Sequence, residues 1–324
     1  RPGTGPELKL YYDLDVAESG GVAFPGARIG LANPDGFRWL FVDRMDRQER
    51  IGAELAWRMS SALKVWLGAE HNDRENLRGY RFAEPVAEGV TLLSNRFITG
   101  SVSLGARFAF RGQLVRVPGR QFIIPSKWPV LHVRAMQAFE GLWALGDLPG
   151  GQRAISRIDV MVEQRFRLRM LGDLSLRALG GMASDDAPYA FLYNLRGTFD
   201  RKIPIATPNA FETMRPNEFL ADRYASLHLR HSFGHLLYEG KEFKPVPVLV
   251  ANAAWGTLAR PESHRGYNFT PLADGFYEAG LQIDNLLRSG FTGLGIGAYW
   301  RFGPHTLPET IDNLAVKASI GLAF

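Results

Sequence analysis

The chain has 324 residues, of which 46% are hydrophobic, and it contains 35 glycines, 21 phenylalanines and no cysteine. The lack of cysteine excludes a disulfide framework and cysteine-ligated metal sites. The net charge of +5 is spread along the sequence without a basic run, which argues against nucleic acid as a partner. No apolar run approaches the roughly 18 to 20 residues of a membrane helix, so strands are the remaining way to span a membrane.

Period-two alternation of apolar and polar residues predicts fourteen strands. We expect them to form one transmembrane antiparallel β-barrel, so the predicted fold class is all-β and residues 1–324 are a single barrel domain. The predicted strands are 7–16, 20–31, 36–46, 48–59, 61–71, 96–111, 128–142, 153–170, 172–182, 221–234, 246–258, 276–288, 292–302 and 312–324.

The clearest alternation lies in residues 157–170, RIDVMVEQRFRLRM, where one face is charged and the other is apolar except at Gln164. This stretch is about twice as long as a typical soluble strand of roughly 5 to 6 residues and suits a tilted membrane strand. We interpret the charged face as a ladder that lines a wet lumen. The ladder consists of Arg157, Asp159, Glu163, Arg165, Arg167 and Arg169.

The same separation of charge recurs in residues 54–59, 101–111, 277–284, 293–302 and the C-terminal strand. Across these six segments fourteen charged residues lie on one face and none on the other. Lipid contact explains the separation, because an Arg or Lys at mid-depth costs about 2 to 4 kcal/mol. A soluble sandwich with its charges outward would also alternate, but its strands would be shorter.

Loop lengths are also typical of an outer-membrane barrel if the C-terminus is periplasmic. The periplasmic connections 31–36, 59–61, 170–172 and 288–292 are then short, and the external connections 71–96, 182–221 and 258–276 are long. The exceptions are the longer periplasmic connections 111–128 and 234–246 and the short external connections 16–20 and 46–48. We therefore expect the chain in the outer membrane of a Gram-negative bacterium, in contact with lipid and lipopolysaccharide.

The last residues, NLAVKASIGLAF, form a strand that ends on an aromatic residue. Its apolar face carries Val316, Ala318, Ile320, Leu322 and Phe324. We expect this to be the closing strand of the barrel, with Phe324 in an interfacial aromatic girdle. The alternative is an ordinary edge strand.

The longest external loop, 182–221, contains YNLRGTFD at residues 193–200, and five predicted strands follow it. This arrangement resembles the surface-antigen superfamily of outer-membrane barrels, which includes the barrel-assembly insertase and the two-partner secretion transporters. The resemblance implies a sixteen-stranded barrel and an Arg-Gly-aromatic motif that folds back into the lumen. Arg196 and Gly197 match the motif, and Thr198 stands where the aromatic is expected. The resemblance also implies an acidic partner on a later strand, where this chain has Asn252.

Arg-Gly pairs also occur in LRGYRF (77–82) and HRGYNF (264–269). The alternative interpretation of each pair is a turn in which glycine supplies a positive φ and the arginine faces water.

A further resemblance is carried by KWPVLHVRA (127–135), DRYASLHLRHSFG (222–234), FYEAGLQIDNLL (276–287) and GIGAYWRFGPHTLPETIDNLAVKAS (295–319). These stretches are similar to an uncharacterised family that joins a carboxypeptidase-regulatory-like domain to a C-terminal barrel. The resemblance implies that this chain is the C-terminal part of a longer protein and lacks two strands of sixteen.

The residues that could take part in catalysis or metal binding lead to no catalytic, cofactor or metal prediction. His228 and His231 are three apart on a strand, so they point to opposite faces and cannot chelate together. Asp159 and Glu163 share a face and could act as an acid/base pair, although the charge ladder is the simpler interpretation. The sequence has no nucleophile elbow and no phosphate loop.

Three functions remain open on these grounds. The first is a barrel that inserts or translocates polypeptide, or acts in envelope biogenesis, with other envelope proteins as partners. The second is a passive, anion-favouring channel or a structural subunit of an envelope complex, because the predicted lumen is rich in arginine. The third is a barrel hydrolase that uses Asp159 and Glu163.

Overall fold

The structure is a computed structural model that describes residues 5–22, 24, 43–88, 90–110, 113–117, 120–124, 128–141, 154–200, 203–234, 240, 243–289 and 292–322. Its helices are three single turns, η1 (Tyr189–Phe191), η2 (Pro261–Ser263) and η3 (Thr310–Asn313). Within the described ranges, no helix has the length and apolar character needed to cross a membrane.

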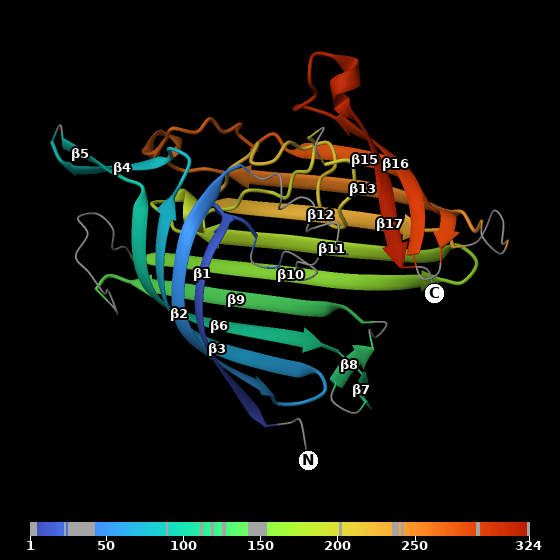
Figure 1. The fold of residues 1–324 in the computed structure, drawn as a ribbon, viewed down its shortest axis with the longest axis horizontal. Coiled ribbons are helices and arrows are strands. Elements are labelled where there is room, and N and C mark those ends of the chain that lie inside the picture. Colours follow the sequence, from blue (N-terminus) through green and yellow to red (C-terminus); the bar gives the residue numbers. More distant parts are fainter. Residues whose placement is uncertain are drawn as a thin grey trace.

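Twelve strands form one antiparallel sheet (Figure 1). The order of these strands in the sheet is the same as their order in the chain. The predicted all-β antiparallel class is therefore confirmed. The strands are β1 (Pro6–Glu18), β2 (Met45–Arg58), β3 (Leu63–Asn76), β6 (Arg96–Ala109), β9 (Val130–Phe139), β10 (Ile155–Leu168), β11 (Gly172–Ala183), β12 (Arg223–Ser232), β13 (Val246–Thr257), β15 (Phe276–Ser289), β16 (Thr292–Phe302) and β17 (Leu314–Leu322).

The main sheet has twelve described strands where the sequence predicted fourteen. The predicted strands 20–31 and 36–46 fall largely on residues 25–42, outside the described residues. β1 pairs directly with β2, and β2 runs unbroken from Met45 to Arg58, so the predicted connection 46–48 was wrong. β1 extends to Glu18, two residues beyond the predicted end at 16. The physical reason is local. Gly20 and Gly21 have φ of 73° and 119°, which ends the extended backbone of β1.

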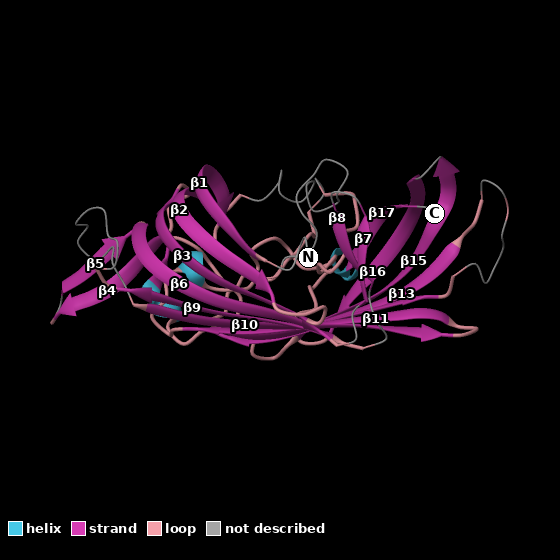
Figure 2. Ribbon diagram, turned by 90° about the horizontal axis from the view of Figure 1, so that it is seen from below, coloured by secondary structure: helices cyan, strands magenta, loops and turns pink. Residues whose placement is uncertain are grey.

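The sheet is a deep trough with β1 at one edge and β17 at the other (Figure 2). Both ends of the sheet curve toward the same side, and loops lie in the hollow between them. Among the described residues β1 and β17 do not pair with each other, so the expected closure of the last strand on the first is not seen. Val316 and Ile320 face outward on β17 as predicted, and Phe324 lies outside the described residues.

The two faces of the sheet differ as the alternation predicted. Apolar side chains on the convex face are exposed, among them Leu104 at 59%, Leu281 at 52% and Val316 at 58%. Several charged side chains on the concave face are buried, and Glu278 and Arg301 are each only 1% exposed. This inverts the arrangement of a soluble protein, and it is the arrangement that a membrane barrel requires.

Short hairpins occupy two of the connections between the described strands of the main sheet, and a two-residue strand lies in a third. β4 (Arg81–Ala87) and β5 (Val90–Ser94) form the external hairpin between β3 and β6, and β14 (His264–Arg265) pairs with β4. The long loops 71–96 and 258–276 therefore lie at the same end of the sheet, as predicted. β7 (Gln113–Val117) and β8 (Arg120–Ile124) form a hairpin inside the long periplasmic connection 111–128.

An aromatic cluster ties the external hairpin to the loop that follows β11. The Tyr80 hydroxyl accepts a hydrogen bond from the backbone N–H of Tyr189 at 3.0 Å and contacts His264 Nδ1 at 2.7 Å. The Tyr80 hydroxyl can donate a hydrogen bond to His264 only if Nδ1 carries no proton. The contact therefore favours neutral His264.

Lowering the pH is expected to loosen this cluster. Burial lowers the pKa of His264 from 6.5 to about 4. Between these values the unfolded chain binds more protons at this site than the folded chain, so the stability of the cluster falls as the pH drops through the window. Hydrogen exchange at residues 80–87 and 263–266, corrected for its intrinsic pH dependence, should rise between pH 6.5 and 4. His264→Gln should remove this rise; an unchanged rise in the variant would contradict the assignment.

Candidate functional site

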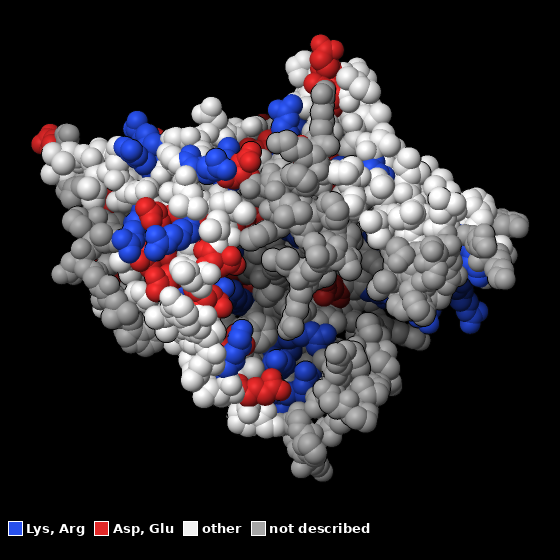
Figure 3. Space-filling view, viewed as in Figure 1, with Lys and Arg blue, Asp and Glu red and all other residues white. Residues whose placement is uncertain are grey.

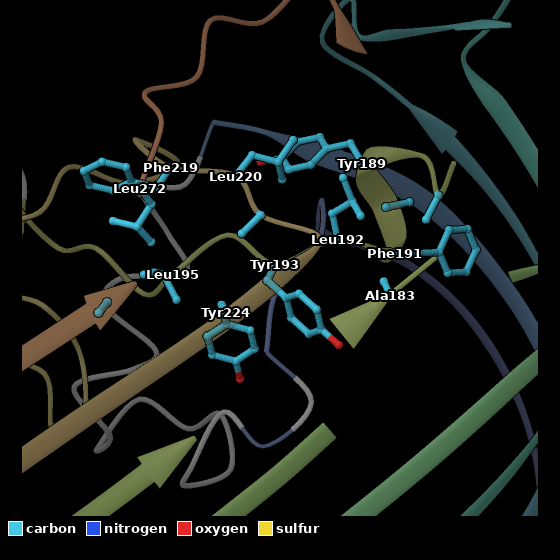
Figure 4. Packing of buried hydrophobic residues seen from close by; sticks show 14 of the residues in the cluster. Ala183, Tyr189, Phe191, Leu192, Tyr193, Leu195, Phe219, Leu220, Tyr224 and Leu272 are labelled. Atoms are coloured by element: carbon cyan, nitrogen blue, oxygen red, sulfur yellow. The ribbon is translucent and has the colours of Figure 1, made fainter. Parts of the chain in front are cut away.

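The loop between β11 and β12, residues 184–222, folds back into the trough (Figures 1 and 2). Its side chains form half of the buried apolar cluster, with Tyr189 and Met214 fully buried and Phe219 at 1% exposure. Figure 4 shows Tyr193 of the loop beside Tyr224 of β12, with ring centroids 4.5 Å apart. Five strands of the main sheet follow this loop, as predicted.

Glu278 on β15 holds the middle of the loop by its backbone. Its carboxylate accepts the N–H groups of Glu212 at 3.0 Å and Thr213 at 2.8 Å, and the Thr213 hydroxyl at 2.6 Å. Asn252 on β13 donates to the same carboxylate at 2.7 Å and to the carbonyl of Ala210 at 3.2 Å. The family resemblance implies an acidic residue at position 252. Here Asn252 binds the backbone of the loop together with the carboxylate of Glu278 on the next strand of the sheet.

Lys317 on β17 forms a buried ion pair with the loop. Its ammonium lies 2.7 Å from Glu212 Oε2, and the two side chains are 3% and 4% exposed. The same ammonium donates to the carbonyl of Thr198 at 2.6 Å and to its hydroxyl at 2.7 Å. Arg301 on β16 pairs with Glu218 at 2.6 Å. Because buried charges are costly without partners, these pairs fix the position of the loop.

The floor of the trough holds the loop through the charge ladder of β10. Arg157 pairs with Asp159 at 3.0 Å and donates to the carbonyls of Phe191 at 3.2 Å and Gly21 at 2.8 Å. The chain after β1 therefore also enters the trough, where the Gly21 N–H donates to the carbonyl of Leu192 at 3.0 Å. Arg157 and Asp159 thus act as anchors beneath the loop.

The rest of the predicted ladder lies toward the periplasmic end. Glu163 is 3.7 Å from Arg177 and half-exposed. Arg165 and Arg167 share Asp173 at 2.7 Å and 3.7 Å, and their side chains are 56% and 86% exposed. Arg169 follows the end of β10 and is exposed. The six ladder residues therefore share one strand but have different environments.

The Arg-Gly motif lies at a close backbone crossing inside the loop. The Phe211 N–H donates to the carbonyl of Arg196 at 2.8 Å, and the Thr198 N–H donates to the carbonyl of Phe211 at 3.0 Å. The Thr198 hydroxyl, which replaces the expected aromatic ring, donates to Glu212 at 2.7 Å. Burial lowers the pKa of Arg196, and the carboxylates of Glu18 and Glu212 oppose that shift.

Gly197→Ala is expected to loosen this crossing. A Cβ at Gly197 would lie 2.3 Å from the carbonyl oxygen of Arg215 and 2.6 Å from that of Met214, so backbone must move. Overpacking of this kind costs about 1 to 3 kcal/mol. Protease cleavage within residues 196–215 should increase in the variant. At Gly180, on β11, the nearest atom would lie at 3.5 Å, so Gly180→Ala is a control without strain. Equal cleavage of both variants would contradict the prediction.

The loop also covers part of the free edge of β17. The Ala206 N–H donates to the carbonyl of Ala318, and the Ala318 N–H donates to the carbonyl of Pro204, both at 2.8 Å. Ile205 and Ala318 thus form a short parallel bridge. Among the described residues, the outer edge of β1 has no such backbone partner.

Sequence reasoning placed Glu278, Arg301 and Lys317 on the inward face but missed their partners Glu212 and Glu218. A signal existed. Glu212 and Glu218 are the two carboxylates within residues 203–221, and the last two strands of the sheet each carry one inward cation, Arg301 and Lys317. A loop that folds back over those strands would bring the opposite charges together.

No protein family profile matches the chain, and no curated protein matches it. Among the solved structures that are similar to it are two outer-membrane proteins. BamA from Haemophilus ducreyi, in a structure lacking POTRA domains 1-3, has a TM-score of 0.55 and 10% identity over 98% of this chain and 59% of that one. CdiB from Escherichia coli has a TM-score of 0.50 and 13% identity over 87% of this chain and 46% of that one. This chain therefore spans about half the length of these proteins.

Proposed function

We propose that this chain, which has the fold of an outer-membrane β-barrel, inserts or translocates polypeptide at the seam between β1 and β17. The observation that carries the proposal is the unpaired seam: each of these strands has one strand neighbour among the described residues. An edge strand exposes a row of N–H and C=O groups on which another strand can be built.

The two edges are prepared differently for an incoming strand. β1 presents thirteen residues, and its outward side chains Leu8, Leu10 and Leu14 are more than 60% exposed. The edge of β17 is partly covered by Pro204–Ala206, which the ion pair of Lys317 with Glu212 holds nearby. A strand that adds to β17 must displace this segment, so movement of the loop belongs to the proposed mechanism.

The proposed cellular location and partners rest on the two resemblances. The loop motif resembles the surface-antigen superfamily, and BamA and CdiB have a similar fold at low identity. We place the protein in the Gram-negative outer membrane, with lipid, lipopolysaccharide and other envelope proteins as partners. The resemblance to the uncharacterised family supports a longer protein whose regulatory-like domain precedes this barrel.

A reversible lock on the loop tests the function. Ile205 and Ala318 are bridge partners, and the chain has no native cysteine, so Ile205→Cys with Ala318→Cys supplies the only thiols. Proteoliposomes that carry the reduced variant should accelerate the folding of a urea-denatured outer-membrane barrel, and oxidation should stop this. Each single cysteine variant is the control. Full activity in the oxidised variant would contradict the mechanism, and no acceleration by the unmodified protein would contradict the function.

A passive, anion-favouring channel is the second candidate, because four arginines line the lumenal cavity. Single-channel recording with anion preference would support it, and a silent bilayer would support the docked loop as a plug. For a hydrolase, Asp159 and Glu163 would have to work together. Asp159 is bound to Arg157, whereas Glu163 lies near Arg177 and His132, so the structure offers no shared acid/base site.

A further inference from the structure

A cavity of about 550 Å³ lies in the periplasmic half of the trough, beneath the turn Ala206–Ala210 of the loop. Its walls come from the inward faces of β6, β9–β13 and β15–β17. Figure 3 looks onto this concave side, where basic side chains gather near the centre of the hollow. The volume falls within the range of roughly 300 to 1,000 Å³ that is usual for small-molecule sites.

The charged lining has an excess of cations. Glu212 is neutralised by Lys317 at 2.7 Å, and Asp284 by Arg230 at 2.6 Å. Among the described residues, no carboxylate oxygen lies within 4.0 Å of the Arg107 guanidinium.

Arg165 adds to this excess. It shares Asp173, which is not part of the lining, with Arg167. Glu163, the remaining carboxylate of the lining, lies 3.7 Å from Arg177. The excess positive charge therefore comes from Arg107, which has no carboxylate partner among the described residues, and from the two arginines at Asp173.

The rest of the lining is largely apolar. Val130 and Val250 lie on the inward faces of β9 and β13, and Ala206, Pro208 and Ala210 of the loop line the cavity from above. A free inorganic anion would leave these side chains in contact with water, whereas a ligand with an apolar part would bury them. Guanidinium groups bind phosphate and carboxylate through charge-assisted hydrogen bonds.

We propose that the cavity binds an anionic amphiphile, with a phosphate or carboxylate head group at Arg107 and Arg165 and its apolar part against Val130, Val250 and the turn Ala206–Ala210. The head group supplies the counter-ion that the cavity lacks. The site does not depend on the seam, so this proposal stands apart from polypeptide insertion.

Titration calorimetry in lipid nanodiscs tests the site with hexyl phosphate as the probe. The unmodified protein should bind it saturably with one site per chain. Arg107→Gln should weaken binding by about tenfold or more, because a hydrogen bond to a charged group contributes about 1.5 to 3 kcal/mol. The double variant with Arg165→Gln should bind weaker still. Arg260→Gln, which removes an exposed arginine in the external loop, should bind as the unmodified protein does.

The other outcomes overturn the proposal. Equal affinity of the Arg107→Gln and Arg260→Gln variants would exclude the guanidinium site. Equal binding of hexyltrimethylammonium would show that charge is not recognised, and inorganic phosphate that binds as tightly as hexyl phosphate would show that the apolar lining does not contribute. Heat-modifiable gel mobility confirms that each variant is folded before titration.

Discussion

Lys317→Met should release the loop from β17 and lower the free energy of unfolding by about 3 to 5 kcal/mol, because it leaves a buried carboxylate without its partner. Glu212 is 4% exposed, and its Oε2 lies 2.7 Å from the ammonium that the substitution removes. The carbonyl and hydroxyl of Thr198 lose the same donor. The loop should then leave the free edge of β17 more often.

Urea unfolding, followed by tryptophan fluorescence, measures the loss of stability, and limited proteolysis within residues 196–215 reports the release of the loop. The matched control is Lys317→Met combined with Glu212→Gln, which removes both charges and should recover most of the stability. If Lys317→Met alone is as stable and as protected as the unmodified protein, the ion pair does not hold the loop.

Ile296→Arg should destabilise the inserted protein by about 2 to 4 kcal/mol, the cost of an arginine on the lipid face at mid-depth. Ile296 lies near the middle of β16, and its side chain is 48% exposed on the convex face. In water the same exposed position would accept arginine at little cost. The substitution therefore distinguishes hydrocarbon from solvent as the environment of this face.

The control for Ile296→Arg is Ile311→Arg. Ile311 lies in η3 of the external connection between β16 and β17 and is 70% exposed, so arginine there should be nearly neutral. Folding in lipid vesicles across a urea series gives both values. If neither substitution lowers the free energy of unfolding, the convex face contacts water, which is the soluble-sandwich alternative.

The inward and outward residues of each strand could be predicted from the sequence. The reason is that a charge on the lipid face has a large free-energy cost and that side chains alternate strictly between the two faces. A single charge on the lipid face of a strand is costly, so residues such as Asp159 and Glu278 could be assigned inward from parity alone. The five strands after the loop were found for the same reason. The convex face of the structure, with Leu104 and Leu281 exposed, agrees with that assignment.

The start of the chain and the partners of the loop could not be predicted in the same way. Gly20 and Gly21 lie between two stretches that alternate like strands, and their positive φ values, just after the last pair of β1 with β2, mark the end of that strand in the structure. Parity shows that Lys317 faces inward, but which loop carboxylate it meets depends on how residues 184–222 fold back. The hairpin of β7 and β8 did have a signal, since Pro-Gly at 118–119 separates two short alternating runs.

The most direct test of the central claim is collision accessibility of nitroxide labels along β15 in proteoliposomes. The chain has no native cysteine, so single cysteines at Leu281 and Gln282 carry the label without interference. We predict that the label at 281 collides freely with oxygen and little with a water-soluble nickel chelate, and that the label at 282, beneath the loop, is shielded from oxygen. Equal access of the nickel chelate to both positions would contradict a lipid-facing convex side and a loop-filled lumen.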